Sequence, residues 1–321
     1  MPPPVEGEAN SLQQEVFTMD KAYLDCKFGM EIEFTGIPRH KVSYILSQFF
    51  QAPAAIYVSD TGRKTYRIKD KSNRTWRVKS DGSIEAQTRR PNGRPQRATE
   101  DYRVELITPP LRYSKDIQTL MEIMKQIVAA GAFVNDTCGI HIHLDGKNHT
   151  AQTLKNLCNI VANRTELLDL TLRTEPYRRF HYCKDMDEDF LLEINKTSFL
   201  TLEDIEESWY DGWDEPRDKR YHQSRYCFLN LHCYFHGNKT VELRCFNSTL
   251  DCEEIRAYIA LALGINFLAM TTKYTWYKPV MVDNPRYTMT HFLQRIGLKG
   301  SEFASCRQIL TRHLTGDPNW R

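Results

Sequence analysis

Alternating apolar and polar residues mark four separate segments of the chain. Between positions 27 and 35 (KFGMEIEFT), every second residue is large and apolar. The same two-residue period recurs at 102–108, 138–144 and 239–246. Such alternation predicts strands that bury one face and leave the other face polar. Shorter strands are expected at 64–69 and 75–80, before the sequence Asp81-Gly82-Ser83.

Apolar residues at helical spacing predict helices over 39–51, 114–130, 150–173 and 253–273. Ser114 and Asp251 are the expected N-caps of the second and fourth helices, and Gly131 closes the second. The stretches 225–233 and 239–246 predict a hairpin around Gly237-Asn238. The polar segment 89–100, rich in Pro and Gly, is expected to be a surface loop.

The order of these elements favours one main domain. Strands mixed with long helices are typical of an α+β fold on a mainly antiparallel sheet. Residues 1–20 begin with three prolines after Met1 and are expected to be a flexible leader, followed by a main domain over 21–275. Within it, 177–221 is polar and aromatic and predicts a helical insertion or lid. Residues 276–321 are expected to form a helical extension packed on the same domain.

Composition narrows the classes of partner. Lys and Arg number 43 against 41 acidic residues, a net charge of +2, which is no footprint of nucleic-acid or membrane binding. Basic residues do crowd 63–103 and 217–225. We interpret both stretches as solvated loop surface, with contact to a polyanion as the alternative.

Cysteine usage points to a reducing compartment. The nine cysteines include no Cys-x-x-Cys pair, which argues against a structural zinc site. Most lie within apolar patterns, where a free thiol packs as a small hydrophobe, and we interpret Cys138 and Cys245 in this way. With no signal peptide and no long apolar run, the sequence predicts a cytoplasmic protein.

The polar faces of the predicted strands carry an unusual set of side chains. Alternation places Glu31 and Glu33 on one face, about 6–7 Å apart, where two like charges need a compensating cation or other partner. The other three strands repeat the arrangement with Glu105, with His141 and His143, and with Glu242 and Arg244. Taken singly, each face is ordinary for a half-exposed antiparallel sheet. Taken together, carboxylates with imidazoles favour Mg²⁺ or Mn²⁺.

Five motifs carry a family resemblance. FGMEIEF, DGSIE, VELITPP, CGIHIHLD and KTVELRCFNSTLD occur in this order in the chain. This series resembles the amidoligase family, carboxylate–amine ligases similar in fold to glutamine synthetase and glutamate–cysteine ligase, and the resemblance covers Phe28 to Ile259. It implies a curved, mainly antiparallel sheet that carries the active site on one face and helices on the other.

The resemblance also implies roles for single residues. The metal ligands that it implies are Glu31, Glu33, Glu105, His141 and Glu242. It makes His143 a polar contact near substrate and phosphate, and it directs Arg225 and Arg244 to the transferred phosphoryl group. Asp81 resembles a loop aspartate that helps to position ammonia in glutamine synthetases, but that loop precedes the Glu-x-Glu strand there and follows it here. A type I turn is therefore an equal alternative for Asp81.

These parts together predict an ATP-dependent ligase. ATP with Mg²⁺ or Mn²⁺ would convert a carboxylate to an acyl phosphate, which an amine attacks, with Asp81 or Glu85 accepting the proton. The expected partners are small-molecule or peptide carboxylates and amines, and an oligomer is possible. Two alternatives remain open: a metal-dependent hydrolase that uses the same Glu and His set, and an inactive binding module.

Overall fold

The computed structural model describes residues 22–59, 62–196 and 200–320, so the predicted leader at 1–20 lies outside the described part of the chain. The strands are β1 Lys27–Phe34, β2 Ala55–Val58, β3 Lys64–Lys69, β4 Thr75–Lys79, β5 Gln87–Arg89, β6 Pro95–Arg97, β7 Val104–Ile107, β8 Leu111–Arg112, β9 Gly139–Asp145, β10 Leu229–Asn230 and β11 Thr240–Asn247. The α-helices are α2 Arg39–Phe50, α3 Tyr113–Ala129, α4 Ala151–Ala162, α5 Thr165–Leu172, α6 Pro176–His181, α7 Glu188–Lys196, α8 Leu202–Tyr210, α9 His232–Phe235, α10 Cys252–Thr271, α11 Pro285–Arg295 and α12 Ala304–Thr311. Short 3₁₀ turns are η1 Ala22–Asp25, η2 Glu100–Tyr102, η3 Gln223–Arg225 and η4 Ser301–Phe303.

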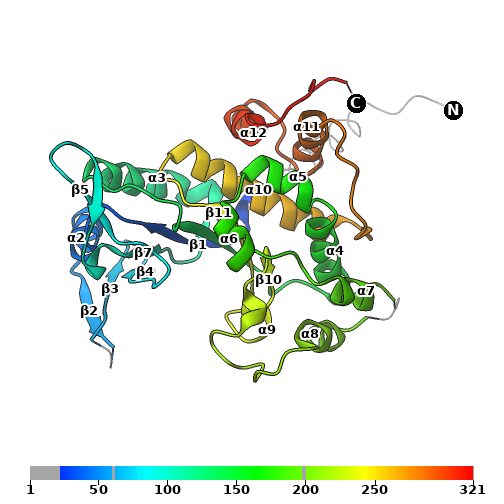
Figure 1. Ribbon diagram of the computed structural model, residues 1–321, viewed down its shortest axis with the longest axis horizontal. Coiled ribbons are helices and arrows are strands. Elements are labelled where there is room, and N and C mark those ends of the chain that lie inside the picture. The colour runs from blue at the N-terminus through cyan, green and yellow to red at the C-terminus, as the bar shows by residue number, and fades with distance from the viewer. Residues whose placement is uncertain (1–21, 60–61, 197–199, 321) are drawn as a thin grey trace, which may run out of the picture.

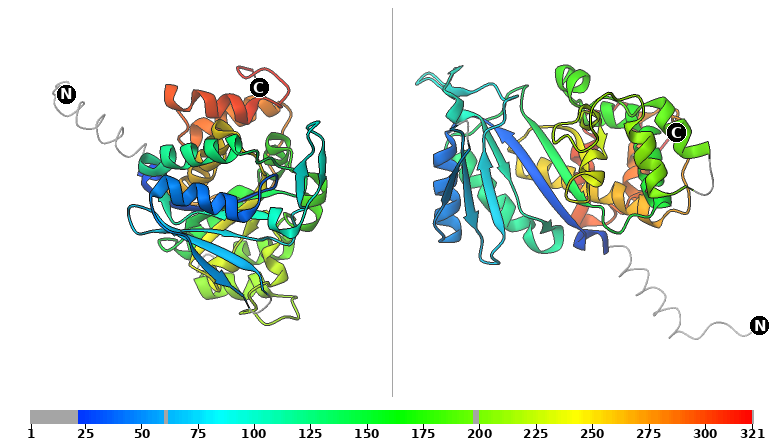
Figure 2. Two further views of the ribbon diagram at one scale, coloured as in Figure 1. Left: turned by 90° about the vertical axis from the view of Figure 1, so that its left-hand side faces the viewer. Right: turned by 90° about the horizontal axis from the view of Figure 1, so that it is seen from below.

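One large sheet organises the molecule. Its strand order is β10-β11-β9-β1-β7-β4-β3-β2, with β8 also paired to β1, and its registered pairs are antiparallel. Strand β1 lies near the centre, between β9 and β7, and in the right panel of Figure 2 it runs between the cyan strands and the helical half of the molecule. The α+β prediction with a mainly antiparallel sheet is therefore confirmed.

Helices bury the apolar face of this sheet. Phe28, Met30 and Ile32 of β1 are at most 1% exposed. Figure 1 shows α3 and α10 lying along one side of the sheet, and the Cys252 thiol contacts the Met121 carbonyl to join the two helices. Among the described residues, α10 alone is long and apolar enough to span a membrane, but 72% of its apolar window is buried in the fold. It is the central helix of the core.

Local signals predicted several boundaries well. The Asp251 carboxylate accepts hydrogen bonds from the backbone N–H groups of Glu253 and Glu254, so it caps α10 as predicted. Gly131 follows α3 with φ of +103°, a conformation that glycine adopts without steric cost. Ser114 is not the cap of α3, because the helix already begins at Tyr113 after Arg112, and the prediction there was wrong.

Tertiary contacts overrode three other predictions. The helix expected over 150–173 is divided into α4 and α5, and the Asn163 side-chain amide between them donates to the Trp276 carbonyl. The loop expected at 89–100 contains the small hairpin β5–β6. In the hairpin expected from 225 to 246, only Leu229 and Asn230 pair with β11, and α9 occupies the connection.

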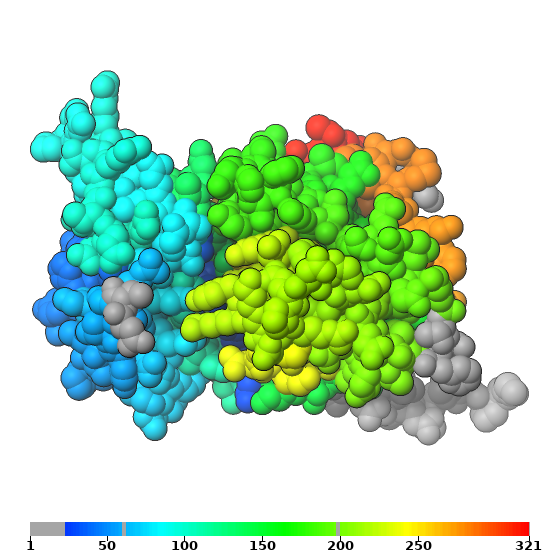
Figure 3. Space-filling model, turned by 60° about the horizontal axis from the view of Figure 1, so that its bottom comes forward, coloured from blue at the N-terminus to red at the C-terminus, as the bar shows by residue number. Residues whose placement is uncertain are grey.

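We call residues 174–235 the covering segment; its described part contacts β11 and adds the short edge strand β10 to the sheet. Arg178 donates to the Arg244 carbonyl at 3.2 Å, and the Cys183 thiol donates to the same carbonyl at 3.0 Å. In Figure 3 the green-to-yellow residues of this segment lie across the middle of the molecule, beside the blue-to-cyan β2–β4 region. The predicted insertion at 177–221 contains α6, α7 and α8, while the domain boundaries stay a prediction.

Candidate active site

A continuous row of polar side chains crosses six neighbouring strands. Directly opposed residues of antiparallel strands point to the same face of a sheet. The registered pairs are Lys79 with Glu105, Glu105 with Glu33, Glu31 with His141, His143 with Glu242, and Glu242 with Asn230. We call these eight residues the polar stripe, and it runs from β4 to β10.

Two carboxylates converge on His141 near the middle of the stripe. The His141 Nδ1 atom lies 3.1 Å from Glu31 Oε2 and 3.6 Å from Glu242 Oε1. One donor atom from each of these three residues lies within 4.8 Å of the others, which is the spacing of a metal-ligand group. The Nε2 atom of His141 is buried and has no hydrogen-bond partner in the described part of the chain.

Glu33 occupies a tighter pocket than its neighbour Glu31. Its Oε2 accepts a hydrogen bond of 2.7 Å from the Gly139 backbone N–H and lies 3.8 Å from Nη1 of Arg178. A Cβ atom at position 139 would lie 2.1 Å from both terminal guanidinium nitrogens of Arg178. Glycine at 139 therefore lets the buried Arg178 guanidinium lie against the start of β9.

The stripe continues on the other side of β1 with a third acid. Glu105 lies opposite Glu33 on the paired strand, and it is buried. Lys79 extends from β4 and places its Nζ 3.0 Å from Glu105 Oε2. This single lysine offsets part of the charge of two opposed carboxylates.

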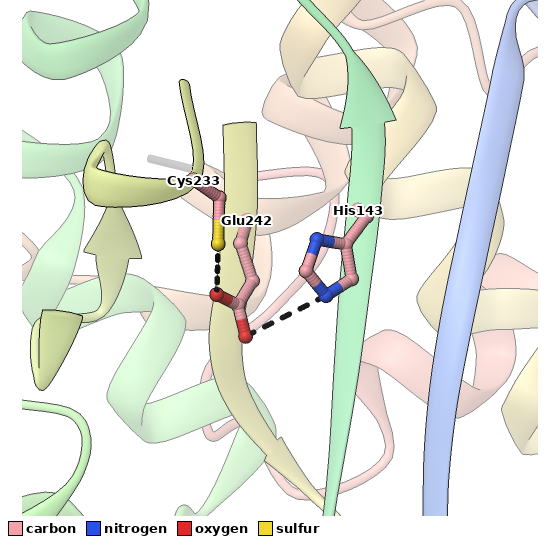
Figure 4. Close-up of side chains that lie close together, drawn as sticks. All are labelled: His143, Cys233 and Glu242. Atoms are coloured by element: carbon pink, nitrogen blue, oxygen red, sulfur yellow. Dashed lines mark hydrogen bonds and ion pairs between the residues drawn. The ribbon is translucent and has the colours of Figure 1, made fainter. Parts of the chain in front are cut away.

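Glu242 is the most heavily contacted acid. Arg244 Nη1 donates to its Oε1 at 2.5 Å, and the Asn230 side-chain amide donates to its Oε2 at 2.5 Å. The Cys233 thiol also donates to Oε2 at 3.3 Å, and His143 Nε2 lies 3.8 Å from Oε1 (Figure 4). The carboxylate is thus surrounded by groups that favour its charged form.

Burial and neighbouring charges divide the acids into two classes. Burial, with the Asp81 charge, raises the pKa of Glu33 to about 7, and burial with the Glu31 charge raises the pKa of Glu105 well above its usual value. Burial would also raise the pKa of Glu31 and Glu242, but their partners outweigh it. The hydrogen bond with His141 and the nearby His143 ring hold the pKa of Glu31 well below its usual value, and Arg244 holds the pKa of Glu242 at about 2.

The two histidines also diverge. Burial and the nearby Arg244 charge lower the pKa of His141 to about 4, so His141 is held neutral with a lone pair on one ring nitrogen. Burial acts in the same direction on His143, but the Glu242 charge outweighs it and raises the pKa of His143 well above its usual value. Neutral imidazole is the form that binds a metal, which suits the implied ligand role of His141.

The remaining sequence candidates lie at the rim or apart. Asp81 Oδ1 accepts from both the backbone N–H and the hydroxyl of Ser83, so this carboxylate closes its own turn while its charge reaches Glu33. Glu85 is exposed. Arg225 lies over the rings of Tyr221 and Tyr226, at 5.3 and 5.6 Å from their centroids, and no hydrogen bond or ion pair joins it to the stripe in the described part of the chain.

The residues present fit one or more divalent cations. Glu33, Glu105, His141 and Glu242 are buried, so this face is not the half-exposed surface of an ordinary antiparallel sheet. Buried carboxylates need compensation, and carboxylate oxygens with one neutral imidazole are suitable ligands for Mg²⁺ or Mn²⁺. The orphaned Nε2 atom of His141 is consistent with a missing partner of this kind.

Sequence reasoning missed four members of the site. Lys79 could have been found, because it lies two residues beyond Arg77 on a strand whose alternation was recognised. Asn230 and Cys233 were assigned to a hairpin strand, which hid their approach to Glu242. Arg178 comes from the covering segment, where no periodic pattern links it to β9.

Comparison with known protein families gives a match over most of the chain. The family model described as "Putative amidoligase enzyme" matches residues 24–266. The chain belongs to the amidoligase family. The match confirms the resemblance that the five motifs carry, and it makes this amidoligase a member of a family of ligases.

Two further comparisons add little to the assignment. No curated protein matches the amidoligase. Among solved structures, a bifunctional glutathione synthetase from Pasteurella multocida is similar, with a TM-score of 0.47 and 11% sequence identity. That similarity covers 94% of this chain and 48% of the other, so the amidoligase spans about half the length of that protein.

Proposed function

We propose that this amidoligase joins a carboxylate to an amine at the expense of ATP, through an acyl phosphate. The observation that carries the proposal is the polar stripe, in which acids from three strands, most of them buried, lie beside two histidines and the buried Arg244. Membership of the amidoligase family supports the reaction class. The substrates are small molecules or peptides that supply the acid and the amine.

The position of each residue in the stripe suits it to a separate proposed role. Glu31, His141 and Glu242 would hold one divalent cation, and Glu33 with Glu105 would hold a second beside it. A bound cation would neutralise phosphate oxygens and polarise the γ-phosphate for attack. The Arg244 guanidinium, fixed by Glu242, supplies positive charge from β11 at the same place.

The proposed substrate-facing residues are one member of the stripe and three residues outside it. His143 would contact the substrate or the transferred phosphoryl group, and Arg225 would reach that group from η3 on the covering segment. Tyr226 lies between the two arginines, with Arg244 5.9 Å and Arg225 5.6 Å from its ring centroid. Asp81 or Glu85 would accept the proton of the attacking amine. Water must be kept out so that the acyl phosphate survives.

Calorimetry of ATP binding with and without EDTA tests the metal requirement. We expect binding only when Mg²⁺ or Mn²⁺ is present, and equal affinity in EDTA would contradict the proposal. A screen of acid–amine pairs for ADP release then identifies substrates. Turnover that needs the metal but not ATP would instead favour a hydrolase that uses the same residues.

A further inference from the structure

We propose that Cys233, His143 and Glu242 form a second kind of metal site, which takes Zn²⁺ and withdraws Glu242 from the Glu31–His141–Glu242 group. Donor atoms of the three residues lie within 4.8 Å of one another (Figure 4). A thiolate, an imidazole and a carboxylate are the donors that Zn²⁺ binds in sites with one open position. The claim that Zn²⁺ competes with a second cation for Glu242 rests on the proposed function, whereas the claim that Zn²⁺ binds at Cys233 does not.

The orientation of His143 supports this site. Its Nδ1 lies 3.2 Å from the Thr240 hydroxyl oxygen, whereas its Nε2 is buried without a hydrogen-bond partner in the described part of the chain. In the metal-bound site the ring is neutral, because Zn²⁺ displaces the Nε2 proton to solvent as it binds. With Nδ1 donating to Thr240, the lone pair of Nε2 then faces Glu242 and Cys233. Metal-bound histidines commonly donate their second ring N–H in this way, which sets the tautomer.

The fold also holds Cys233 in place. Asn230 bonds Glu242 through its side-chain nitrogen and accepts from the His232 N–H through its oxygen at 2.8 Å, so α9 starts at a set distance from β11. A Cβ atom at Gly237 would lie 2.6 Å from the Cys233 carbonyl oxygen. The chain thus folds tightly back over Cys233 before β11 begins.

Ligand chemistry separates this site from the neighbouring one. Glu31 and Glu33 offer oxygen, which Mg²⁺ prefers, whereas a thiolate selects borderline-soft ions such as Zn²⁺ and Co²⁺. On binding, the Cys233 thiol releases its proton to solvent and its sulfur donates a lone pair to the metal. Because both groups share Glu242, Zn²⁺ at the thiol would reduce binding of the hard cation.

Cobalt spectroscopy on the metal-free full-length protein tests the site without ATP or turnover. We expect Co²⁺ to produce a thiolate charge-transfer absorption that Zn²⁺ removes by displacement. Cys233→Ser should abolish the absorption. The matched control Cys227→Ser, at another half-buried cysteine of the covering segment, should keep it. Absorption that survives in Cys233→Ser, or is missing from the wild type, would overturn the proposal.

Thiol alkylation of the unaltered protein gives a second readout that needs no variant. At a Zn²⁺ concentration of about ten times Kd, alkylation of Cys233 should slow about tenfold, because only the unbound fraction reacts. The exposed Cys26 should react as before, and Mg²⁺ at the same concentration should not protect Cys233. Equal protection by Mg²⁺ would refute selection by the thiol. Loss of Mn²⁺ binding on addition of Zn²⁺ then tests the competition for Glu242.

Discussion

At the scale of single residues, Glu31 and Glu33 behave as different acids although they are two positions apart. Glu31 contacts His141 at 3.1 Å, which favours its charged form. Burial and the nearby Asp81 charge disfavour the charged form of Glu33 and raise its pKa. Sequence alternation predicted that both side chains share one face, but it could not predict this difference, because the partners come from other strands.

Substitution of the two acids should therefore change stability in opposite directions. Glu33→Gln keeps an oxygen acceptor for the Gly139 N–H and removes one of several neighbouring negative charges. The unfolding free energy of the metal-free protein should therefore stay equal or rise by up to about 1 kcal/mol. Glu31→Gln loses a charge-assisted hydrogen bond and should cost about 1–3 kcal/mol. Urea unfolding in EDTA measures both.

Both substitutions should also weaken Mn²⁺ binding, because each removes a ligand charge. The control is Glu122→Gln, at an exposed acid on α3 that pairs with Lys125 and should leave Mn²⁺ affinity unchanged. Calorimetric titration with Mn²⁺ gives the affinities. Unchanged affinity in both stripe variants would remove the basis of the ligase proposal.

Gly139 and Gly29 form a natural comparison on two adjacent strands. A Cβ at 139 would collide with the Arg178 guanidinium at 2.1 Å, whereas a Cβ at 29 would meet only the His143 Cβ at 3.9 Å, an ordinary contact. Gly139→Ala should therefore cost about 1–3 kcal/mol of unfolding free energy through overpacking and move Arg178 from Glu33.

Gly29→Ala serves as the matched control and should unfold within about 0.5 kcal/mol of the wild type, the range of substitutions that disturb no special feature. Urea denaturation of the two variants side by side makes the measurement. Equal loss in both would mean that the Arg178 guanidinium does not lie against position 139.

At the scale of elements, helix α10 depends on its capped end. Asp251 accepts two backbone hydrogen bonds at the N-terminus of the central core helix. Asp251→Ala should lower the unfolding free energy by about 1 kcal/mol. The comparison variant Asp218→Ala, at an exposed turn position, should change it little. Thermal and urea unfolding measure the difference, and equal effects would remove the capping role.

The elements that sequence predicted well are those with local causes. Alternation defined β1, β7, β9 and β11, and the Asp251 cap defined the start of α10. The break between α4 and α5 has no glycine or proline to announce it, because its contact comes from Trp276, 113 positions away. Likewise α9 replaces the end of a predicted strand. There the Asn230 side chain accepts from the His232 N–H and donates to Glu242. These contacts join residues that are brought together only when the chain folds, so a local sequence pattern cannot indicate them.

At the scale of the whole molecule, a cation should act as part of the fold. The stripe gathers Glu31, Glu33, Glu105 and Glu242 from three strands of one sheet, so a ligand that binds only the folded protein should stabilise all of it. Mn²⁺ at a hundred times Kd should add about 2.7 kcal/mol to the unfolding free energy. EDTA should reverse the gain.

Differential scanning calorimetry at increasing Mn²⁺ concentration measures this stabilisation as a rise in melting temperature. Glu33→Gln should show a smaller rise than the wild type at each concentration, while Glu122→Gln should match the wild type. A rise that is equal in all three proteins would place the bound metal away from the stripe. In that case the buried acids would be compensated by Arg178, Arg244 and Lys79 alone.

The covering segment has a consequence for how such proteins diversify. It is one uninterrupted stretch of chain, from 174 to 235, whereas Glu31, Glu33, Glu105, His141 and Glu242 all lie on sheet strands outside it. A gene could therefore exchange the whole stretch by recombination and retain the acids of the sheet. Asn230 and Cys233 would be exchanged with it. One such event would replace Arg225 and Cys233 together, and with them the proposed phosphoryl contact and the proposed thiol ligand.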